Sequence, residues 1–231
     1  MDRKIIYYMN IVMLCVCLYL IQGKPEKRIE IEENIERDKI EETVETVADT
    51  SIMPGRYPIM GKSDTTLEQM ATYFENSENE YPGEILGQGG APDIETFCKI
   101  YQEEAEKEGI RAEVAFAQTM KETGWLQYGG DASIEQYNFA GIGTTGGGVE
   151  GNAYPDVRTG VRAQIQHLKA YATEEELNTK CVDERYDYVT KGCAPYVEWL
   201  GQKENPEGTG WATSENYGYD IVEMIRKMKD L

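Results

Sequence analysis

The chain has 231 residues and a formal net charge of −19, with 42 acidic residues against 23 basic ones. This length accommodates one ordinary domain with appendages. The charge argues against a nucleic-acid-binding protein, whose surface needs Lys and Arg to neutralise phosphates, and it gives no electrostatic attraction to anionic lipid. The single histidine, His167, excludes metal sites built from several imidazoles and argues against Ser-His-Asp or Cys-His catalysis. We therefore expect no metal and no cofactor.

The amino end is a membrane signal. Basic residues at positions 3 and 4 precede an apolar run from Ile5 to Ile21, which as a helix would be roughly 26 Å long, near the lower limit for crossing a bilayer. Residues 18–23, LYLIQG, are mostly bulky where a cleavage site needs small residues, so we expect residues 1–23 to be an uncleaved anchor. Secretion after signal cleavage is the alternative. The basic end should stay in the cytoplasm, which places the rest of the chain outside it.

An acidic linker follows the anchor. Residues 26–50 contain ten acidic and four basic residues and no aromatic one, which is typical of a solvated tether. Residues 1–25 carry +2 and residues 26–50 carry −6, so residues 51–231 carry −15. We assign the linker to residues 24–60 and the folded domain to residues 61–231, with its core at 93–231. Before that core, a lead-in rich in Gly and Pro includes one short helix near Thr66 to Phe74.

Helical spacing of apolar residues begins after Pro92-Asp93 and stops at Gly109. A glycine-rich stretch from 131 to 155 permits short strands or a loop but no long helix. We expect an α+β domain that is mainly helical. The expected long helices cover residues 94–108, 112–123, 156–172 and 215–228.

The cysteines outside the anchor leave one question open. Cys181 and Cys193 bracket a short loop that a disulfide can close in an oxidising compartment, and the thiols can equally stay reduced. We interpret Cys98 as a buried apolar residue on a helix and His167 as a structural residue.

Glu122 is the candidate general acid. It ends a largely apolar or small segment and precedes Gly124, which should terminate the helix, and Trp125. Gln118 lies four residues earlier, on the same helix face. Desolvation beside an indole and the negative end of the helix both raise the pKa of a carboxyl group, which favours a proton donor near neutrality. A solvent-facing glutamate beside a packed Trp125 is the alternative, and composition alone leaves both open.

A family resemblance bears on this choice. Residues 117–125, AQTMKETGW, resemble the Ala-Gln-x-x-x-Glu-Ser-Gly-Trp motif of the glucosaminidase family of peptidoglycan hydrolases, glycoside hydrolase family 73. Three further segments are similar to that family's motifs in the same order. They are YNFAGIG at 137–143, AYPD at 153–156 and WATSENYG at 211–218. The similarity covers about residues 93–231.

The resemblance implies a lysozyme-like fold whose cleft lies between the helical part and a small β lobe. It implies hydrolysis of the β-1,4 bond after N-acetylglucosamine in peptidoglycan glycan strands, the expected partner. Glu122 would protonate the leaving oxygen, and Tyr217 would support the sugar or the developing charge. The other residues that it places at the cleft are Gln118, Trp125, Asn138, Phe139, Tyr154 and Trp211, whose rings include candidates for stacking on sugars.

The second catalytic group is less clearly marked. We choose Glu150 in the glycine-rich stretch, with Glu135 and Asp156 behind it, although Asp156 can simply cap the helix that follows. A second carboxyl about 5 Å from the acid implies retention, a separation of roughly 6.5–9.5 Å implies inversion, and the substrate's own acetamide is a third route.

Two other functions remain as alternatives. An N-acetylmuramidase or a lytic transglycosylase would use one glutamate on the same fold. A wall-binding module would keep the fold without catalysis.

Overall fold

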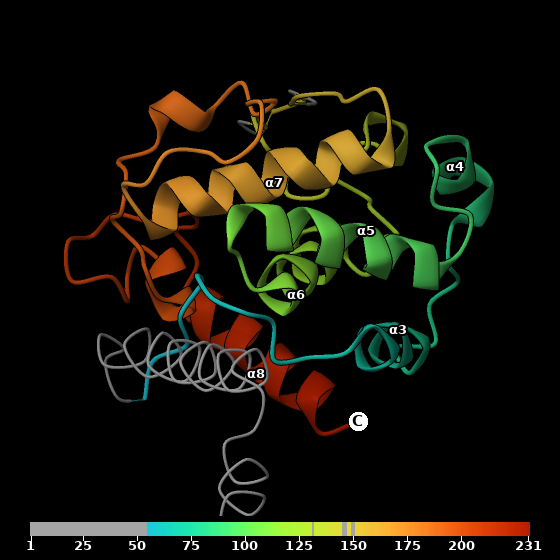
Figure 1. The fold of residues 1–231 in the computed structure, drawn as a ribbon, viewed down its shortest axis with the longest axis horizontal. Coiled ribbons are helices and arrows are strands. Elements are labelled where there is room, and N and C mark those ends of the chain that lie inside the picture. The colour runs from blue at the N-terminus through green and yellow to red at the C-terminus, as the bar shows by residue number, and fades with distance from the viewer. Residues whose placement is uncertain (1–54, 131, 145–146, 149–150) are drawn as a thin grey trace, which may run out of the picture. The chain divides into compact units, whose positions relative to one another are not determined.

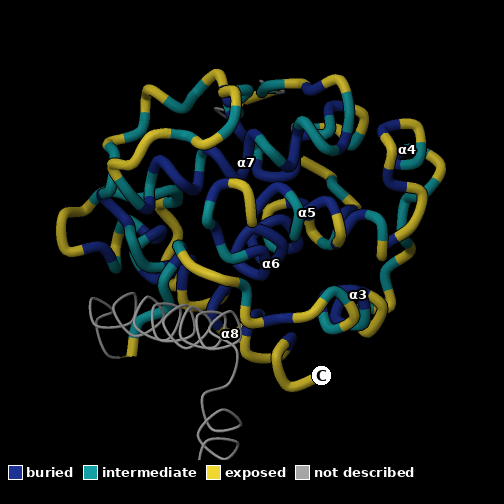
Figure 2. Tube along the Cα trace, viewed as in Figure 1, coloured by how far each residue is buried: buried dark blue, intermediate teal, exposed yellow. Residues whose placement is uncertain are grey.

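Helix α6 (Ala112–Thr123) is the central element of the protein. The structure is a computed structural model and describes residues 55–130, 132–144, 147–148 and 151–231. Ten of the twelve residues of α6 are buried, and Figure 2 shows this helix in the buried interior. Its small residues, including Ala115 and Ala117, let three other helices pack closely against it, α5 (Ile94–Glu108), α7 (Val157–Ala172) and α8 (Tyr217–Lys229).

The described residues are mainly helical (Figure 1). Helix α5 packs against α7, and α8 packs against both α6 and the short helix η3. The other helices are α3 (Leu67–Glu75), α4 (Gly83–Gln88), α5 (Ile94–Glu108), α7 (Val157–Ala172), α8 (Tyr217–Lys229) and the 3-10 helices η1 (Ile134–Gln136), η2 (Tyr186–Tyr188) and η3 (Val197–Leu200).

Local signals account for the helix ends, and the four long helices predicted from the sequence are confirmed to within two residues. Asp93 caps α5 by accepting a hydrogen bond from the Thr96 amide at 2.8 Å. Gly109 and Gly124 end α5 and α6 with positive φ angles of 72° and 57°, which glycine adopts at little cost.

Two glycines let backbone segments approach each other near the later helices. A Cβ on Gly160 of α7 would lie 1.8 Å from the carbonyl oxygen of Tyr137, and one on Gly218 of α8 would lie 2.1 Å from that of Val197. Neither position can hold a side chain unless the backbone shifts. The start of α8, which carries Tyr217, is thus held directly against η3.

The lead-in crosses the domain as an extended segment. The Ile59 amide donates to the Pro195 carbonyl at 3.0 Å, and the Ile59 carbonyl accepts from the Arg111 amide at 3.0 Å. The Tyr57 amide is held by the buried carboxylate of Glu198. Residues 57–59 therefore bond to two parts of the domain, although a division of the chain after residue 60 stays a prediction.

The small β lobe is not shown in the described residues. Strand-like pairing among them is limited to isolated bridges, of which one joins Pro58 to Tyr196. Within 132–144 and 151–156 the chain forms η1 and turns, and Gly141, Gly143 and Gly151 have φ angles between 61° and 80°. Such left-handed residues turn the chain and interrupt an extended strand.

The expected membrane segment, residues 5–21, lies outside the described residues. In the part of the chain that the structure covers, none of the helices combines the length and the apolar character that crossing a membrane requires.

Candidate active site

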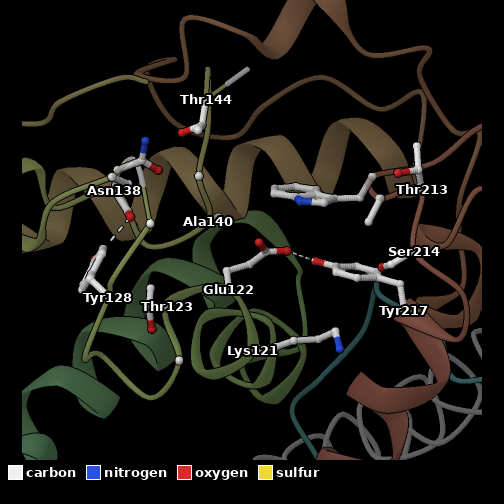
Figure 3. A pocket seen from close by; sticks show the side chains of 16 residues that line it. Lys121, Glu122, Thr123, Tyr128, Asn138, Ala140, Thr144, Thr213, Ser214 and Tyr217 are labelled. Carbon is white, nitrogen blue, oxygen red and sulfur yellow. Dashed lines mark hydrogen bonds between the residues drawn. The ribbon is translucent and has the colours of Figure 1, made fainter. Parts of the chain in front are cut away.

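A cleft of about 730 Å³ opens where the end of α6 meets the start of α8 (Figure 3). Segments from distant parts of the sequence form its walls: the turn and loop after α6 on one side, and the chain before α8 on the other. The larger side chains along it are Lys121, Glu122, Tyr128, Asn138, Thr144, Trp211, Thr213, Ser214 and Tyr217.

Glu122 lies in the last turn of α6 and is exposed to this cleft. Although water reaches it from the open side, surrounding protein desolvates the carboxyl group and raises its pKa. The Tyr217 hydrogen bond and the Lys121 ammonium lower that pKa, but the net shift is upward. An elevated pKa keeps more of the carboxyl protonated as the pH rises, as a proton donor requires.

Tyr217 contacts Glu122 directly. Its hydroxyl donates a hydrogen bond to Oε1 of Glu122, and the ring is almost fully buried at the start of α8 (Figure 3). Burial and the neighbouring Glu122 carboxylate raise the pKa of Tyr217 well above its usual range. The phenol therefore stays neutral and able to donate.

Gln118 lies beneath the cleft and does not line it. Its side chain is fully buried, and its amide donates to the Tyr217 hydroxyl oxygen at 3.1 Å. Gln118 is not on the cleft surface, because it is buried among α6, α7 and α8, and its predicted part in shaping the cleft stays a prediction. Its contact with the cleft is indirect, through Tyr217.

Trp125 also departs from its predicted place. Gly124, Trp125 and Leu126 have consecutive φ angles of 57°, 61° and 62°, so the chain makes a left-handed turn after α6. This turn carries the indole to α3, where its ring centroid lies 5.1 Å from that of Tyr73. Trp125 lines a separate surface groove with Tyr73 and not the cleft at Glu122, so it is not the indole of this site.

Asn138 lines the cleft, whereas Phe139 does not. The Asn138 side chain bonds both the amide and the carbonyl of Ile142, at 2.9 Å each, and the carbonyl of Asn152 at 3.0 Å. It thereby joins the backbone at Ile142 to the backbone at Asn152. Phe139 is in the core, 5.1 Å from Phe97 between ring centroids, so its predicted place at the cleft is wrong.

Among the predicted stacking residues, Trp211 lines the cleft and Tyr154 lies behind its wall. Trp211 packs edge-on against His167, with ring centroids 4.9 Å apart. Tyr154 is buried in a small cluster with Ala140, which is itself a wall residue.

Comparison with known proteins assigns the family. The family model described as "Glucosaminidase: Mannosyl-glycoprotein endo-beta-N-acetylglucosaminidase" matches residues 98–230, which is more than half of the chain. The chain belongs to this family. The match begins in α5, ends just after α8 and includes both Glu122 and Tyr217, so membership indicates a glycoside hydrolase.

A relative among the curated proteins is an uncharacterized protein of Borreliella burgdorferi (strain ATCC 35210 / DSM 4680 / CIP 102532 / B31). It is 34% identical over 135 residues, which are 58% of this chain and 63% of the relative. The chain thus matches less than two thirds of the relative's length. No solved structure matches the chain.

The structure places the three candidates for a second acid, Glu150, Glu135 and Asp156, in different ways. Glu150 lies outside the described residues and stays a prediction. Glu135 does not line the cleft; it is exposed, and a hydrogen bond from the Ser133 hydroxyl lowers its pKa. Asp156 caps α7 by accepting from the Thr159 amide at 2.7 Å. Glu135 and Asp156 are therefore placed for local structure.

His167 and the cysteines have structural environments. His167 contacts the buried Asp183 carboxylate at 2.6 Å through Nδ1. Cys98 is buried on α5, as predicted, and burial raises the pKa of its thiol. Cys181 and Cys193 are both free thiols in the structure. The described residues contain no cluster of His, Cys, Asp and Glu suited to a metal ion.

The sequence did not single out several residues that line the cleft. Lys121 bonds Asp220 of α8 at 2.7 Å, which ties the two helices that carry Glu122 and Tyr217. Thr213 and Ser214 lie within the segment 211–218 already marked by the family motif, so their place was accessible from sequence. Tyr128 was not, because only the left-handed turn after α6 brings it to this wall, where its hydroxyl donates to the Asn138 carbonyl at 3.3 Å.

Proposed function

We propose that the protein hydrolyses the β-1,4 bond that follows N-acetylglucosamine in peptidoglycan, with Glu122 as the general acid. The observation that carries this proposal is the setting of Glu122. Its pKa is raised, it lines the cleft, and it accepts a hydrogen bond from the buried Tyr217. Glu122 protonates the leaving glycosidic oxygen, and Tyr217 stabilises the carboxylate that this transfer leaves behind.

The cleft has groups suited to a neutral sugar. Trp211 offers an indole for stacking on the apolar face of a pyranose ring, and Thr213 and Ser214 offer hydroxyl groups for sugar oxygens. The positive charge of Lys121 is paired with Asp220. Local contacts of this kind therefore supply the recognition in a chain whose residues 51–231 carry −15.

The group that works opposite Glu122 determines the stereochemistry. Glu150 is one candidate, a water held by Tyr217 is a second, and the substrate's acetamide is a third. Glu150 lies between Ile142 and Asn152 in the sequence, and Asn138, which lines the cleft, bonds the backbone of both, which supports Glu150 as the first candidate.

The decisive experiment compares the products and rates of Glu122→Gln with those of the parent protein on purified peptidoglycan. Loss of the acid should lower the rate by about a hundredfold or more. Glu106→Gln, at an exposed carboxyl of α5 outside the cleft, is the matched control and should keep the parent's rate. Mass spectrometry should find N-acetylglucosamine at the new reducing ends.

Other products would redirect the assignment. Reducing-end N-acetylmuramic acid would indicate a muramidase, and its anhydro form a lytic transglycosylase. A parent protein that binds walls but releases no sugar would indicate a non-catalytic module. Full activity of Glu122→Gln would remove Glu122 from the mechanism.

We also propose that residues 1–23 anchor the protein in the cell membrane, with the hydrolase domain outside the cytoplasm. The basic start and the apolar run to Ile21 support this location. Fractionation of cells that express the full chain should find it in the membrane and accessible to added protease in spheroplasts. Recovery of active, shortened protein from the medium would favour signal cleavage instead.

A further inference from the structure

A chain of buried hydrogen bonds leads from helix α7 to the catalytic carboxyl group. Gln164 of α7 and Gln118 of α6 are both fully buried, and the Gln164 amide donates to the Gln118 carbonyl oxygen at 2.9 Å. Gln118 in turn donates to Tyr217 at 3.1 Å, and Tyr217 donates to Glu122. Burial matters here because no water is available to replace a missing partner.

The donor-to-acceptor direction of these hydrogen bonds is fixed at Gln164. The Gln164 NH₂ group donates to the Ala115 backbone carbonyl at 2.9 Å, and a carbonyl oxygen can only accept. The Gln164 oxygen faces two hydroxyl groups, those of Tyr101 at 2.8 Å and Thr119 at 2.9 Å. These hydroxyls also contact each other at 2.6 Å, so one of them donates to the other and the second hydrogen goes to Gln164. A flipped Gln164 amide would place oxygen against oxygen at Ala115, so the Ala115 carbonyl fixes the orientation of the Gln164 amide.

Each following group inherits its direction from Gln164. Because Gln164 donates to the Gln118 oxygen, the Gln118 NH₂ group must face Tyr217. Because the Tyr217 oxygen accepts that bond, its own hydrogen points to Oε1 of Glu122. An Oε1 that accepts a hydrogen bond is a poor place for the acidic proton, and Figure 3 shows the other carboxyl oxygen turned away from Tyr217.

We propose that Gln164 and Gln118 form a buried amide relay that fixes Tyr217 as a donor to Oε1 of Glu122 and so assigns the transferable proton to Oε2. This inference rests on the proposed role of Glu122. Gln164 is a positioning residue, since it acts through Gln118 and Tyr217 and does not line the cleft. The relay keeps the acid in one protonation geometry before substrate arrives.

The titratable groups around Glu122 determine how a change in its titration can be interpreted. Tyr217 faces it from α8, and Lys121 precedes it on α6 and is bonded to Asp220. Tyr128 lines the same cleft. Substitutions in the relay leave the charges of these groups in place, so a change in the Glu122 titration reports the hydrogen bond from Tyr217.

The test is Gln164→Met, which keeps the side-chain length and removes the amide. Gln118 then loses the donor that fixes its orientation, and the Tyr217 hydroxyl is no longer held toward Glu122. Because that hydrogen bond favours the charged carboxylate, its loss should raise the pKa of Glu122. Carbon-13 NMR titration of the free protein measures this without substrate, and the basic limb of kcat/KM on peptidoglycan should move to higher pH, with kcat changed more than KM.

Gln166→Met is the matched control. Gln166 is equally buried on the same helix, but it bonds Thr179 and the backbone near Val182, and none of these hydrogen bonds reaches the relay. The control should lose thermal stability and leave the Glu122 titration unchanged. A shift as large as that of Gln164→Met would overturn the relay, because it would mark a general loosening of α7.

A double variant separates the relay from other effects. In a Tyr217→Phe background, Gln164→Met should produce no further shift, since the hydroxyl that it orients is absent. An undiminished shift in that background, or no shift in the single variant, would overturn the proposal. If Gln164→Met does not fold, Gln118→Met decides: it should also raise the Glu122 pKa, and an unchanged titration would count against the relay.

The relay and the proposed function can fail separately. The NMR titration reports the relay in a protein with no measured activity, whereas the rate of Glu122→Gln reports the function. An active Glu122→Gln protein beside a shifted titration would refute the catalytic role and leave the relay in place.

Discussion

The buried ion pair between Lys169 of α7 and Glu108 of α5 should be the most sensitive electrostatic contact that holds these helices together. The Nζ atom of Lys169 lies 3.0 Å from Oε2 of Glu108, and each side chain is 1% exposed. Lys169→Met removes the ammonium and leaves the carboxylate buried, and removal of one partner of such a pair costs about 3–5 kcal/mol.

The structure places the expected cost at the lower end of that range. Glu108 keeps hydrogen bonds from the amides of Asn178, at 2.8 Å, and Thr179, at 3.0 Å, and from the Thr179 hydroxyl. A loss of about 3 kcal/mol corresponds to a fall in Tm of about 6–12 °C for a domain of this size. Thermal unfolding followed by circular dichroism at pH 7 measures it.

The pH dependence gives a second readout. The hydrogen bonds and Lys169 hold the pKa of Glu108 below its usual range, so the pair stabilises the fold above the unfolded-state pKa and loses this effect as the pH falls through the folded-state pKa. Without Lys169 the carboxyl protonates more easily. The difference in Tm between parent and variant should therefore narrow between pH 7 and pH 4 and not widen.

Matched variants distinguish this effect from simple packing loss. Lys107→Met removes a half-exposed partner of Glu104, which keeps Arg158 and Arg162, and should cost less than about 1 kcal/mol. Replacing both Lys169 and Glu108 by Met should recover stability relative to Lys169→Met alone. Equal losses for Lys169→Met and Lys107→Met, or a difference that does not depend on pH, would refute the reasoning.

Three further predictions concern the cleft, the lead-in and a glycine contact. Lys121→Met should raise the pKa of Glu122, because the Lys121 ammonium lowers it, and the basic limb of kcat/KM should move to higher pH. Lys121→Arg is the control and should keep this limb in place. A shift of the limb to lower pH in Lys121→Met would contradict the prediction. A protein that begins at residue 61 should be less stable than one that begins at residue 55 by roughly 2–6 kcal/mol, since it lacks the hydrogen bonds that Tyr57 donates to the buried Glu113 and Glu198. Thermal unfolding measures this difference, and equal melting temperatures would place the domain boundary after residue 60. Gly160→Ala should cost about 3 kcal/mol in thermal unfolding because its Cβ meets the Tyr137 carbonyl, whereas Gly130→Ala, with open space around it, should cost little.

The helices were predictable because their signals are local. Apolar spacing, the Asp93 cap and the glycines at 109 and 124 act within a few residues of each helix end, and the structure confirms the resulting boundaries. The glycine-rich stretch permitted two readings, short strands or a loop. Its described residues adopt turns, since three of its glycines take left-handed backbone angles that composition does not specify.

Only some of the residues predicted at the cleft line it, because family motifs do not specify backbone angles either. Family motifs identified Glu122, Tyr217, Asn138 and Trp211, which line it. They also suggested Trp125 and Phe139, which pack against other elements. A motif records which residues recur together, but it does not say on which side of a turn each side chain lies.

The sequence by itself determined the long helices, the acidic balance and the segment that contains Glu122, since these depend on neighbouring residues and on composition. Tertiary structure alone decided what surrounds that carboxyl group. Tyr217 is 95 residues away from it, and Gln164 is 46 residues from Gln118, yet both belong to one hydrogen-bonded chain. Helix packing brings Tyr217, Gln118 and Gln164 together in the buried interior. An unsatisfied polar group is costly there, so the orientation of each of these side chains restricts the orientation of the next.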